Sequence, residues 1–218
     1  MKANILKYSL LTAIALTVFT SCVGEDDYAL PAYKDKVVIT AQTPFKETFE
    51  GHTEGSGSNE VAVTSGGWFN ANIGTGNRLW HVRQFSNNKF AEFSSFYSNN
   101  NQIDETWLIT PKLELLDESY SFSFETQVRF YTNDNLSVYI STDFDGTAEG
   151  IETATWTPLN TFISSAAQDG NNEFTGSGVI SLDEYSNSTV RIGFKYVGNK
   201  STGETSTYQI DNVTIFEN

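Results

Sequence analysis

The segment Tyr120–Phe130, YSFSFETQVRF, decides the fold class of this 218-residue chain. All of its apolar side chains occupy even positions, namely Tyr120, Phe122, Phe124, Val128 and Phe130. The polar side chains Ser121, Ser123, Glu125, Gln127 and Arg129 occupy odd positions. Because successive side chains of a strand point to opposite faces of a sheet, this alternation predicts a β-strand with one face in the core and the other in water.

The same period of two recurs along the chain. It places Leu136, Val138 and Ile140 inward in one segment, and Val190, Ile192, Phe194 and Tyr196 inward in another. Further strands are expected at 37–40, 45–50, 79–85, 90–96, 106–110, 179–182 and 208–216. About ten to twelve half-buried strands, separated by turn-forming residues and without helical spacing, are typical of two stacked antiparallel sheets. We therefore predict an all-β fold, an antiparallel jelly-roll β-sandwich.

The last expected strand, TYQIDNVTIFE, contains an irregularity. Its apolar residues are even-numbered at Tyr208 and Ile210 but odd-numbered at Val213 and Ile215. One extra residue near Asp211 would shift the register and re-aim the neighbouring polar side chains, as a β-bulge does. A bend of the strand at a corner of the sheet is the alternative interpretation.

The first 22 residues, MKANILKYSLLTAIALTVFTSC, have the pattern of a bacterial lipoprotein signal. Two lysines precede an apolar run of roughly 10 residues, which is too short to cross a bilayer core. FTSC resembles a lipobox, which implies lipidation of Cys22; an ordinary secretory signal with an incidental thiol is the alternative. We expect a signal peptide at 1–21, a lipidated cysteine and acidic spacer at 22–36, and one β-sandwich domain at 37–218.

The residues after Cys22, VGEDD, resemble the signal that sends Bacteroidetes lipoproteins to the outer face of the outer membrane. A solvated acidic linker is the other interpretation. We expect a lipid-anchored outer-membrane protein facing the cell exterior. Removal of residues 1–21 takes away two lysines and no acid, so the net charge of −14 becomes −16. Such a charge disfavours nucleic acid and favours cations or neutral ligands, and the single cysteine precludes an internal disulfide.

Several segments together resemble the choice-of-anchor J domains, which are related to cleaved-adhesin domains and to jelly-roll modules of the carbohydrate-binding and MAM types. The resemblance covers about 45–216. It is carried by FKETFEG (45–51), GGW (66–68), ETWLITPKLEL (105–115), VYISTDFDG (138–146), W-x-x-L (156–159), VRIGFKYVG (190–198) and YQIDNVTI (208–215).

This resemblance implies that the first and last strands lie side by side and that a structural Ca²⁺ is held there. Mapped onto this sequence, the ligands are Glu50 and Asp211, whose carboxylates are the hard oxygen donors that Ca²⁺ prefers. The alternative is that Glu50 caps a loop and Asp211 forms local hydrogen bonds. The loop STDFDG at 141–146 is expected to be a hairpin turn rather than a calcium loop.

A glycan-binding function needs exposed aromatic faces beside amide and carboxylate groups. The four tryptophans lie in strand patterns and are expected in the core. The better candidates are Tyr131, Tyr139, Gln127 and Arg129, which have the phase of water-facing side chains. We expect non-catalytic binding of an extracellular ligand, with a glycan favoured over a protein partner. Adhesion or assembly at the outer membrane is the alternative.

An enzymatic function is the third interpretation. The sequence lacks the GxSxG, HExxH, P-loop, GxGxxG and CxxC motifs. Its only histidines are His52 and His81, and either is more often a surface or hydrogen-bonded strand residue than a catalytic one. A glycosidase would need two carboxylates facing each other across a cleft, and among 27 acidic residues the sequence marks no such pair.

Overall fold

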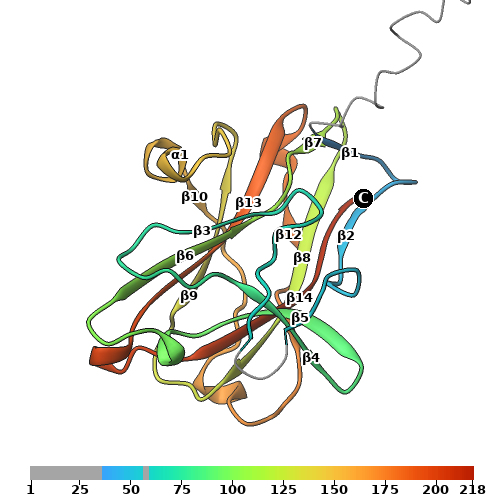
Figure 1. Ribbon diagram of the computed structural model, residues 1–218. Helices are drawn as coiled ribbons and strands as arrows, with labels where there is room; N and C mark the ends of the chain where they lie inside the picture. Colours follow the sequence, from blue (N-terminus) through green and yellow to red (C-terminus); the bar gives the residue numbers. More distant parts are fainter. Residues whose placement is uncertain (1–35, 56–58) are drawn as a thin grey trace, which may run out of the picture. The chain divides into compact units, whose positions relative to one another are not determined.

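The computed structural model describes residues 36–55 and 59–218. The signal peptide, Cys22 and nearly all of the acidic spacer predicted above lie outside the described residues. The described part of the chain forms two β-sheets joined by loops, with one short α-helix, α1 (Ala148–Thr153) (Figure 1). None of the helices in this part is long and apolar enough to span a membrane.

Sheet I contains seven strands. Its hydrogen-bonded path runs β1 (Val37–Ile39), β7 (Leu113–Leu115), β13 (Thr189–Asn199), β6 (Ile103–Ile109) and β3 (Phe69–Asn72), and β9 (Leu136–Ser141) and β10 (Thr157–Pro158) join it through β13. The β1–β7 pair is parallel and the other pairs of this sheet are antiparallel.

Sheet II also contains seven strands, all paired antiparallel. Its path runs β11 (Thr175–Gly176), β8 (Tyr120–Arg129), β14 (Thr207–Glu217), β5 (Asn88–Phe93) and β4 (His81–Phe85), with β12 (Ile180–Ser181) beside β8 and β2 (Phe45–Glu47) beside β14. The 3₁₀ turns lie in the connections, at η2 (Ser95–Tyr97), η3 (Ala166–Gln168), η4 (Asp183–Tyr185) and η5 (Lys200–Thr202).

The core lies between the inner faces of the two sheets. The fully buried side chains there come from both sheets and include Phe122 and Phe124 of β8 and Phe194 and Tyr196 of β13. The rings of Phe124 and Phe194 meet edge to face with centroids 5.2 Å apart. These are the residues that the period of two placed inward, so the predicted all-β sandwich is confirmed, with two sheets that are antiparallel except for the β1–β7 pair.

The alternation in β8 ends one residue earlier than predicted. Phe130 was expected in the core, but its φ of 52° turns the chain after Arg129, and its side chain is 72% exposed. Tyr131 packs against the edge of the core while its side chain stays partly exposed. The inward assignment of Phe130 was wrong, because a left-handed residue at the strand end exchanges the two faces.

The predicted irregularity in the last strand is a register shift between Asp211 and Thr214 in the pairing of β14 with β8. Asn212 within it has a φ of 50°. Before the shift β14 pairs with β5, and after it β14 pairs with β2. The bulge is therefore real, and the expected proximity of the first and last strands is confirmed by the β2–β14 pair.

Two other expectations need correction. The STDFDG segment is not a tight hairpin turn, because β9 and its antiparallel partner β10 are separated by a connection that contains α1. Trp68 and Trp80 belong to the main core as expected. Trp107 and Trp156, however, form a second cluster with Phe144 and Ile151, separate from that core.

Candidate functional site: a pocket in sheet II

The outer face of sheet II carries a pocket of about 240 Å³, which we call the sheet II pocket. Polar and aromatic side chains line it together: Phe85, Ser86, Asn88, Phe90, Gln127, Arg129, Asn172, Phe174 and Gln209. They come from four strands, from the turn between β4 and β5, and from the segment that precedes β11.

The floor of the pocket follows from the strand register. Gln209 of β14 lies directly opposite Gln127 of β8, so the two amides are neighbours on the outer face. On the other side of β14, Gln209 lies opposite Glu92 of β5. Glu92, Gln209 and Gln127 therefore lie in one row across three neighbouring strands, on the outer face of sheet II.

Two connecting segments contribute phenylalanine rings to the pocket. Ser86 and Asn87 both have positive φ angles, of 52° and 66°, as a two-residue type I′ hairpin requires, and this turn ends β4 at Phe85. The Phe85 ring is 66% exposed. Phe174, also in the lining, packs its ring against Phe90 with centroids 5.6 Å apart. The pocket thus combines phenyl rings with an amide floor.

The side chains of Gln127 and Arg129 have no hydrogen-bond or ion-pair partner among the described residues. The Arg129 guanidinium instead lies 5.5 Å from the centroid of the Phe130 ring. Gln127 is 7% exposed. Because polar groups that lose water usually gain a partner, these amide and guanidinium groups are positioned to bind a ligand.

A polar network beside the pocket fixes the Gln209 amide. Its Nε2 donates to Glu92 Oε2 at 2.7 Å, which leaves Gln209 Oε1 as an acceptor. Burial would raise the pKa of the Glu92 carboxyl, but the contacts with His81 and Gln209 and the charge of Arg83 together hold that pKa below its ordinary value. Glu92 is therefore an anion at neutral pH and an acceptor for the Gln209 amide.

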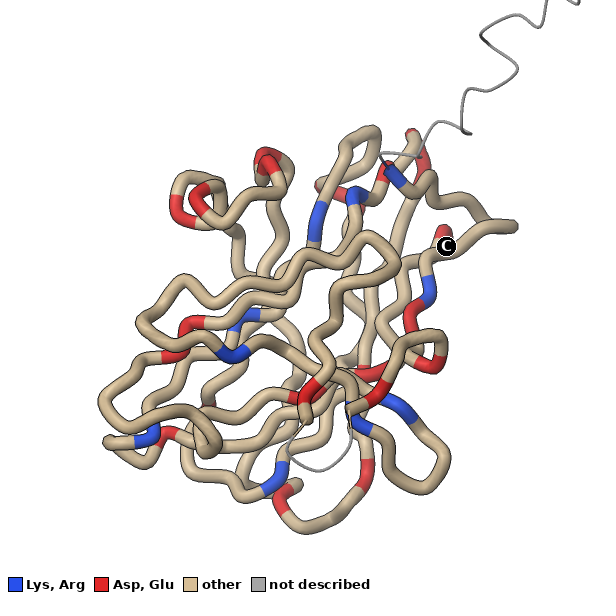
Figure 2. Tube along the Cα trace, in the orientation of Figure 1, with Lys and Arg blue, Asp and Glu red and all other residues tan. Residues whose placement is uncertain are grey.

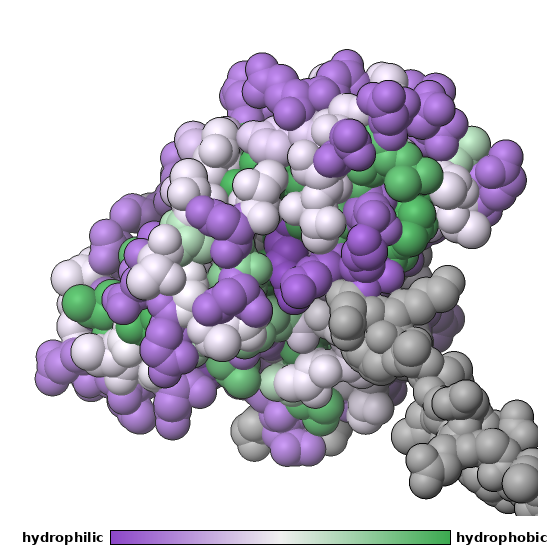
Figure 3. Space-filling model, turned by 90° about the horizontal axis from the view of Figure 1, so that it is seen from above, coloured by the Kyte–Doolittle hydropathy of each residue, from purple (hydrophilic) through white to green (hydrophobic). Residues whose placement is uncertain are grey.

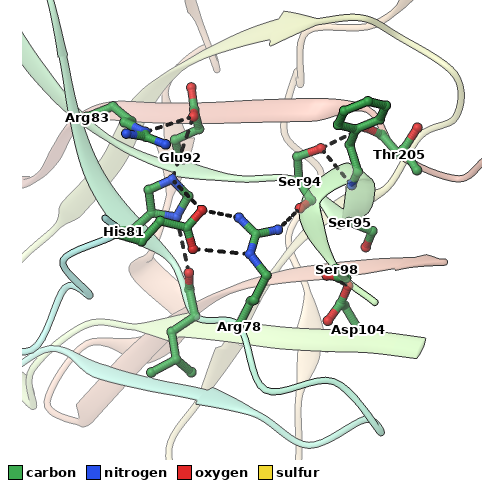
Figure 4. Close-up of polar contacts among 12 residues, drawn as sticks. Arg78, His81, Arg83, Glu92, Ser94, Ser95, Ser98, Asp104 and Thr205 are labelled. Carbon is green, nitrogen blue, oxygen red and sulfur yellow. Dashed lines mark hydrogen bonds and ion pairs between the residues drawn. The ribbon is translucent and has the colours of Figure 1, made fainter. Parts of the chain in front are cut away.

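The network continues to the edge of the sheet (Figure 4). His81 Nε2 lies 3.7 Å from both Glu92 Oε1 and Glu60 Oε1. The Arg78 guanidinium contacts Glu60 through two nitrogens and donates to the carbonyl of Ser94. His52, the other histidine, hydrogen-bonds Glu47 and Ser65. Both histidines are thus held in structural networks outside the lining of the pocket.

The structure separates the four predicted ligand-binding residues. Gln127 and Arg129 line the sheet II pocket together. Tyr139 lies on the outer face of sheet I, with its ring 5.6 Å from that of Trp107. The partly buried Tyr131 donates its hydroxyl to Asp134 at 3.1 Å. Only the two residues of β8 share a site, and whether any of the four binds a ligand stays a prediction.

Sequence reasoning missed the other pocket residues. Gln209 could have been found, because it occupies a polar phase between Tyr208 and Ile210 in the last strand. Phe90 and Phe174 carried no such signal. Their contact joins residues 84 positions apart, through a segment without regular secondary structure.

Glu50 and Asp211, the predicted calcium ligands, lie near each other beside this pocket. Asp211 Oδ2 accepts from Asn88 Nδ2 at 2.9 Å and Oδ1 from the Asn212 backbone at 2.7 Å. Glu50 Oε1 accepts from the Lys89 backbone at 2.9 Å. Burial first, and then the charges of Glu125 and Glu50, raise the pKa of Asp211 to about 6.

Carboxylate oxygens lie around Asp211, and these are the donors that a hard cation prefers. A bound cation would also relieve the repulsion between the carboxylates. In the part of the chain that the structure describes, however, no group of three or more His, Cys, Asp or Glu is arranged to hold a metal ion. Amide or carbonyl oxygens would have to complete the shell. Calcium binding by Glu50 and Asp211 stays a prediction.

The fold and the pocket define a β-sandwich domain with a polar and aromatic site on one sheet. The chain belongs to the family described as a domain of unknown function (DUF5017), whose model matches residues 82–217. No curated protein sequence matches it.

Among solved structures, the chain is similar to the K1 cleaved adhesin domain of Lys-gingipain from Porphyromonas gingivalis W83 (18% identity, 81% of this chain and 99% of that one, TM-score 0.43). It is also similar to a putative sugar binding protein from Bacteroides thetaiotaomicron (14% identity, 74% and 96%, TM-score 0.44). A third similar structure is the CBM22-1 xylan-binding domain of Xyn10C from Paenibacillus barcinonensis (10% identity, 83% and 97%, TM-score 0.42).

The Asp211→Asn variant tests the calcium prediction. Without metal, the raised pKa means that the folded state disfavours the ionised carboxylate. Wild type should therefore lose stability as the pH rises from about 4 to about 6. Asp211→Asn should lack this loss and be more stable at pH 7 by up to about 3 kcal/mol in chelator. Calcium should raise the melting temperature of wild type but not of the variant.

The measurement is thermal unfolding at several pH values, with chelator or with Ca²⁺, for wild type, Asp211→Asn and the exposed control Asp169→Asn. The difference between wild type and Asp211→Asn isolates Asp211, because the other carboxyls contribute to both. Identical curves for wild type with chelator and with Ca²⁺ would contradict calcium binding. An unchanged pH dependence in Asp211→Asn would contradict the raised pKa.

Proposed function

We propose that this protein binds an extracellular glycan in the sheet II pocket without turning it over. The observation that carries the proposal is the pair of unpartnered polar groups, Gln127 and Arg129, beside Gln209 and between exposed and half-buried phenylalanine rings. Sugar rings present C–H groups to aromatic faces and hydroxyls to amides, and this pocket offers both kinds of contact.

The character of the lining favours an acidic sugar. Although the protein as a whole is strongly negative, none of the residues that line the pocket is a carboxylate. Arg129 supplies a guanidinium there that can hold a carboxylate or sulfate in a bidentate manner. The small volume suits one sugar residue or the end of a chain.

The same lining supports binding without catalysis as part of the proposal. Hydrolysis of a glycosidic bond needs a pair of carboxylic groups across the substrate. Glu92 contacts the amide floor, and it is engaged by Gln209 and His81. The groups that face the pocket are amides, hydroxyls, a guanidinium and phenyl rings, which bind a sugar but do not supply a general acid.

Adhesion to a protein partner is the second candidate function, and one surface favours it. Several large apolar side chains are exposed, among them Phe96 and Tyr97 of η2 and Ile103 and Val197 of sheet I. The Phe96 and Tyr97 rings meet edge to face with centroids 5.1 Å apart. Exposed apolar groups of this kind are common at protein interfaces.

We further propose that lipid on Cys22 tethers the domain to the outer membrane, facing the exterior. The apolar run, the FTSC sequence and the acidic residues that follow support this location. The resemblance of several motifs to choice-of-anchor J domains supports a surface protein as well. A tether of this kind would hold the binding domain close to polymers outside the cell.

Replacement of Phe85 by alanine tests the glycan proposal. The probes are galactan, xylan, pectin and chondroitin, measured by isothermal titration calorimetry. Phe85→Ala should weaken binding of the polysaccharide that binds wild type by roughly 3- to 10-fold, because one ring face is lost. Its melting temperature should stay near that of wild type, since the ring is mostly exposed.

Phe96→Ala is the matched control, because Phe96 is also an exposed phenylalanine but lies outside the pocket. It should leave glycan affinity unchanged. Binding of no polysaccharide by wild type would remove the glycan proposal, and equal weakening by both variants would remove the pocket as its site.

Cys22→Ser tests the tether. Labelled palmitate should enter wild type and not the variant when both are produced in a host that processes lipoproteins, and the variant should leave the membrane fraction. Equal labelling of the two proteins, or none in either, would contradict lipidation at Cys22.

A further inference from the structure

A second pocket lies on the outer face of sheet I, at the end where β1 and β7 pair, and encloses about 420 Å³. We call it the basic pocket. Its charged lining residues are Lys36, Lys112, Arg191 and Asp143.

Figure 2 shows Lys and Arg at this end of the domain, with Asp and Glu among them. Figure 3, which views the domain from above, shows a surface that is largely hydrophilic with apolar residues between. Three cations in one pocket are unexpected in a chain with 27 acidic and 13 basic residues.

The strand register brings these cations together. β1 and β7 pair in parallel with Val37 opposite Leu113, so the preceding residues Lys36 and Lys112 are neighbours across the pair. The Val37 backbone donates to the Lys112 carbonyl at 2.7 Å. Arg191 points outward from β13, between the inward-facing Val190 and Ile192. Like charges placed side by side repel each other, which costs stability unless an anion lies between them.

Arg191 is held in place but incompletely hydrogen-bonded. Its Nη1 donates to the Thr110 carbonyl at 2.8 Å, and its guanidinium carbon lies 5.5 Å from the centroid of the Phe144 ring. Its Nε is buried without a partner among the described residues. Burial also lowers the pKa of this guanidinium. Such a group is fixed for recognition of an acceptor that supplies two oxygens.

Two carboxylates, Glu114 and Asp143, lie near the three cations, so the charge of this region is +1, and neither carboxylate pairs with Lys112 or Arg191. Glu114 Oε1 lies 2.5 Å from Lys36 Nζ and balances that lysine. Asp143 Oδ1 accepts from the Ser141 hydroxyl and from the Thr155 backbone, both at 2.8 Å, and these bonds lower the pKa of Asp143. Among the described residues, neither Lys112 nor Arg191 has a carboxylate within ion-pair distance.

We propose that the basic pocket binds a phosphate or sulfate group. The Arg191 guanidinium would donate to its oxygens, Lys112 would add a point charge, and the hydroxyl of Thr189 on the lining would add a hydrogen bond. This site lies on sheet I, so it is independent of the glycan proposal for sheet II. The group can come from free phosphate or from a lipid headgroup, because the recognising chemistry is the same.

Calorimetric titration of the full-length mature protein with inorganic phosphate at low ionic strength tests this proposal. Wild type should show saturable binding. Arg191→Gln and Lys112→Gln should each weaken it by roughly tenfold or more, since each removes a charge-assisted contact. Lys200→Gln is the matched control, because Lys200 lies outside the pocket above the Phe96 ring, and it should bind as wild type does. Thermal unfolding of every variant checks that it is folded.

Vesicles provide the second arm. Sedimentation of the non-lipidated Cys22→Ser protein, with and without Arg191→Gln or Lys112→Gln, detects a headgroup when phosphatidylcholine vesicles that contain a minor share of phosphatidic acid are compared with phosphatidylcholine alone. Binding of inorganic phosphate that depends on Arg191 and Lys112 supports the site with a soluble ligand. Binding only to the phosphatidic acid vesicles with the same dependence supports it with a lipid. No binding in either arm, or the same weakening in Lys200→Gln, overturns the proposal.

Discussion

The bulge in β14 at Asp211 and Asn212 is the constraint on which the organisation of sheet II depends. β14 lies next to β8 along its whole length, but on its other side it pairs with β5 before the bulge and with β2 after it. Without the extra residue, the apolar side chains of Val213 and Ile215 would face water instead of the core. The left-handed conformation of Asn212 thus keeps both halves of the strand buried.

The same bulge sets the polar side of the sheet. It follows the last β5 pair, at Ile210, and the register before it places the Gln209 amide between Glu92 and Gln127. It also turns Asp211 toward Asn88, whose neighbours in the β4–β5 hairpin form one wall of the sheet II pocket. Pocket and carboxylate cluster are therefore two consequences of one local backbone irregularity.

The sequence predicted those features that arise from neighbouring residues in one strand. Alternation in β8 and β13 gave the inner and outer faces, and the parity change after Ile210 gave the bulge. It failed at Phe130, because a single positive φ is not visible as a pattern. It also could not predict the contact of Phe90 with Phe174 or the meeting of Lys36, Lys112 and Arg191, since these depend on which distant strands become neighbours.

The central claim is that the ligand lies on the outer face of sheet II. Backbone amide NMR spectra during titration with an oligosaccharide that binds the protein test it most directly. The largest shift changes should fall on the β4–β5 hairpin, on Gln127 to Arg129 and on Gln209. Changes confined to β6, β9 and β13, around Trp107 and Tyr139, would move the site to sheet I and contradict the account.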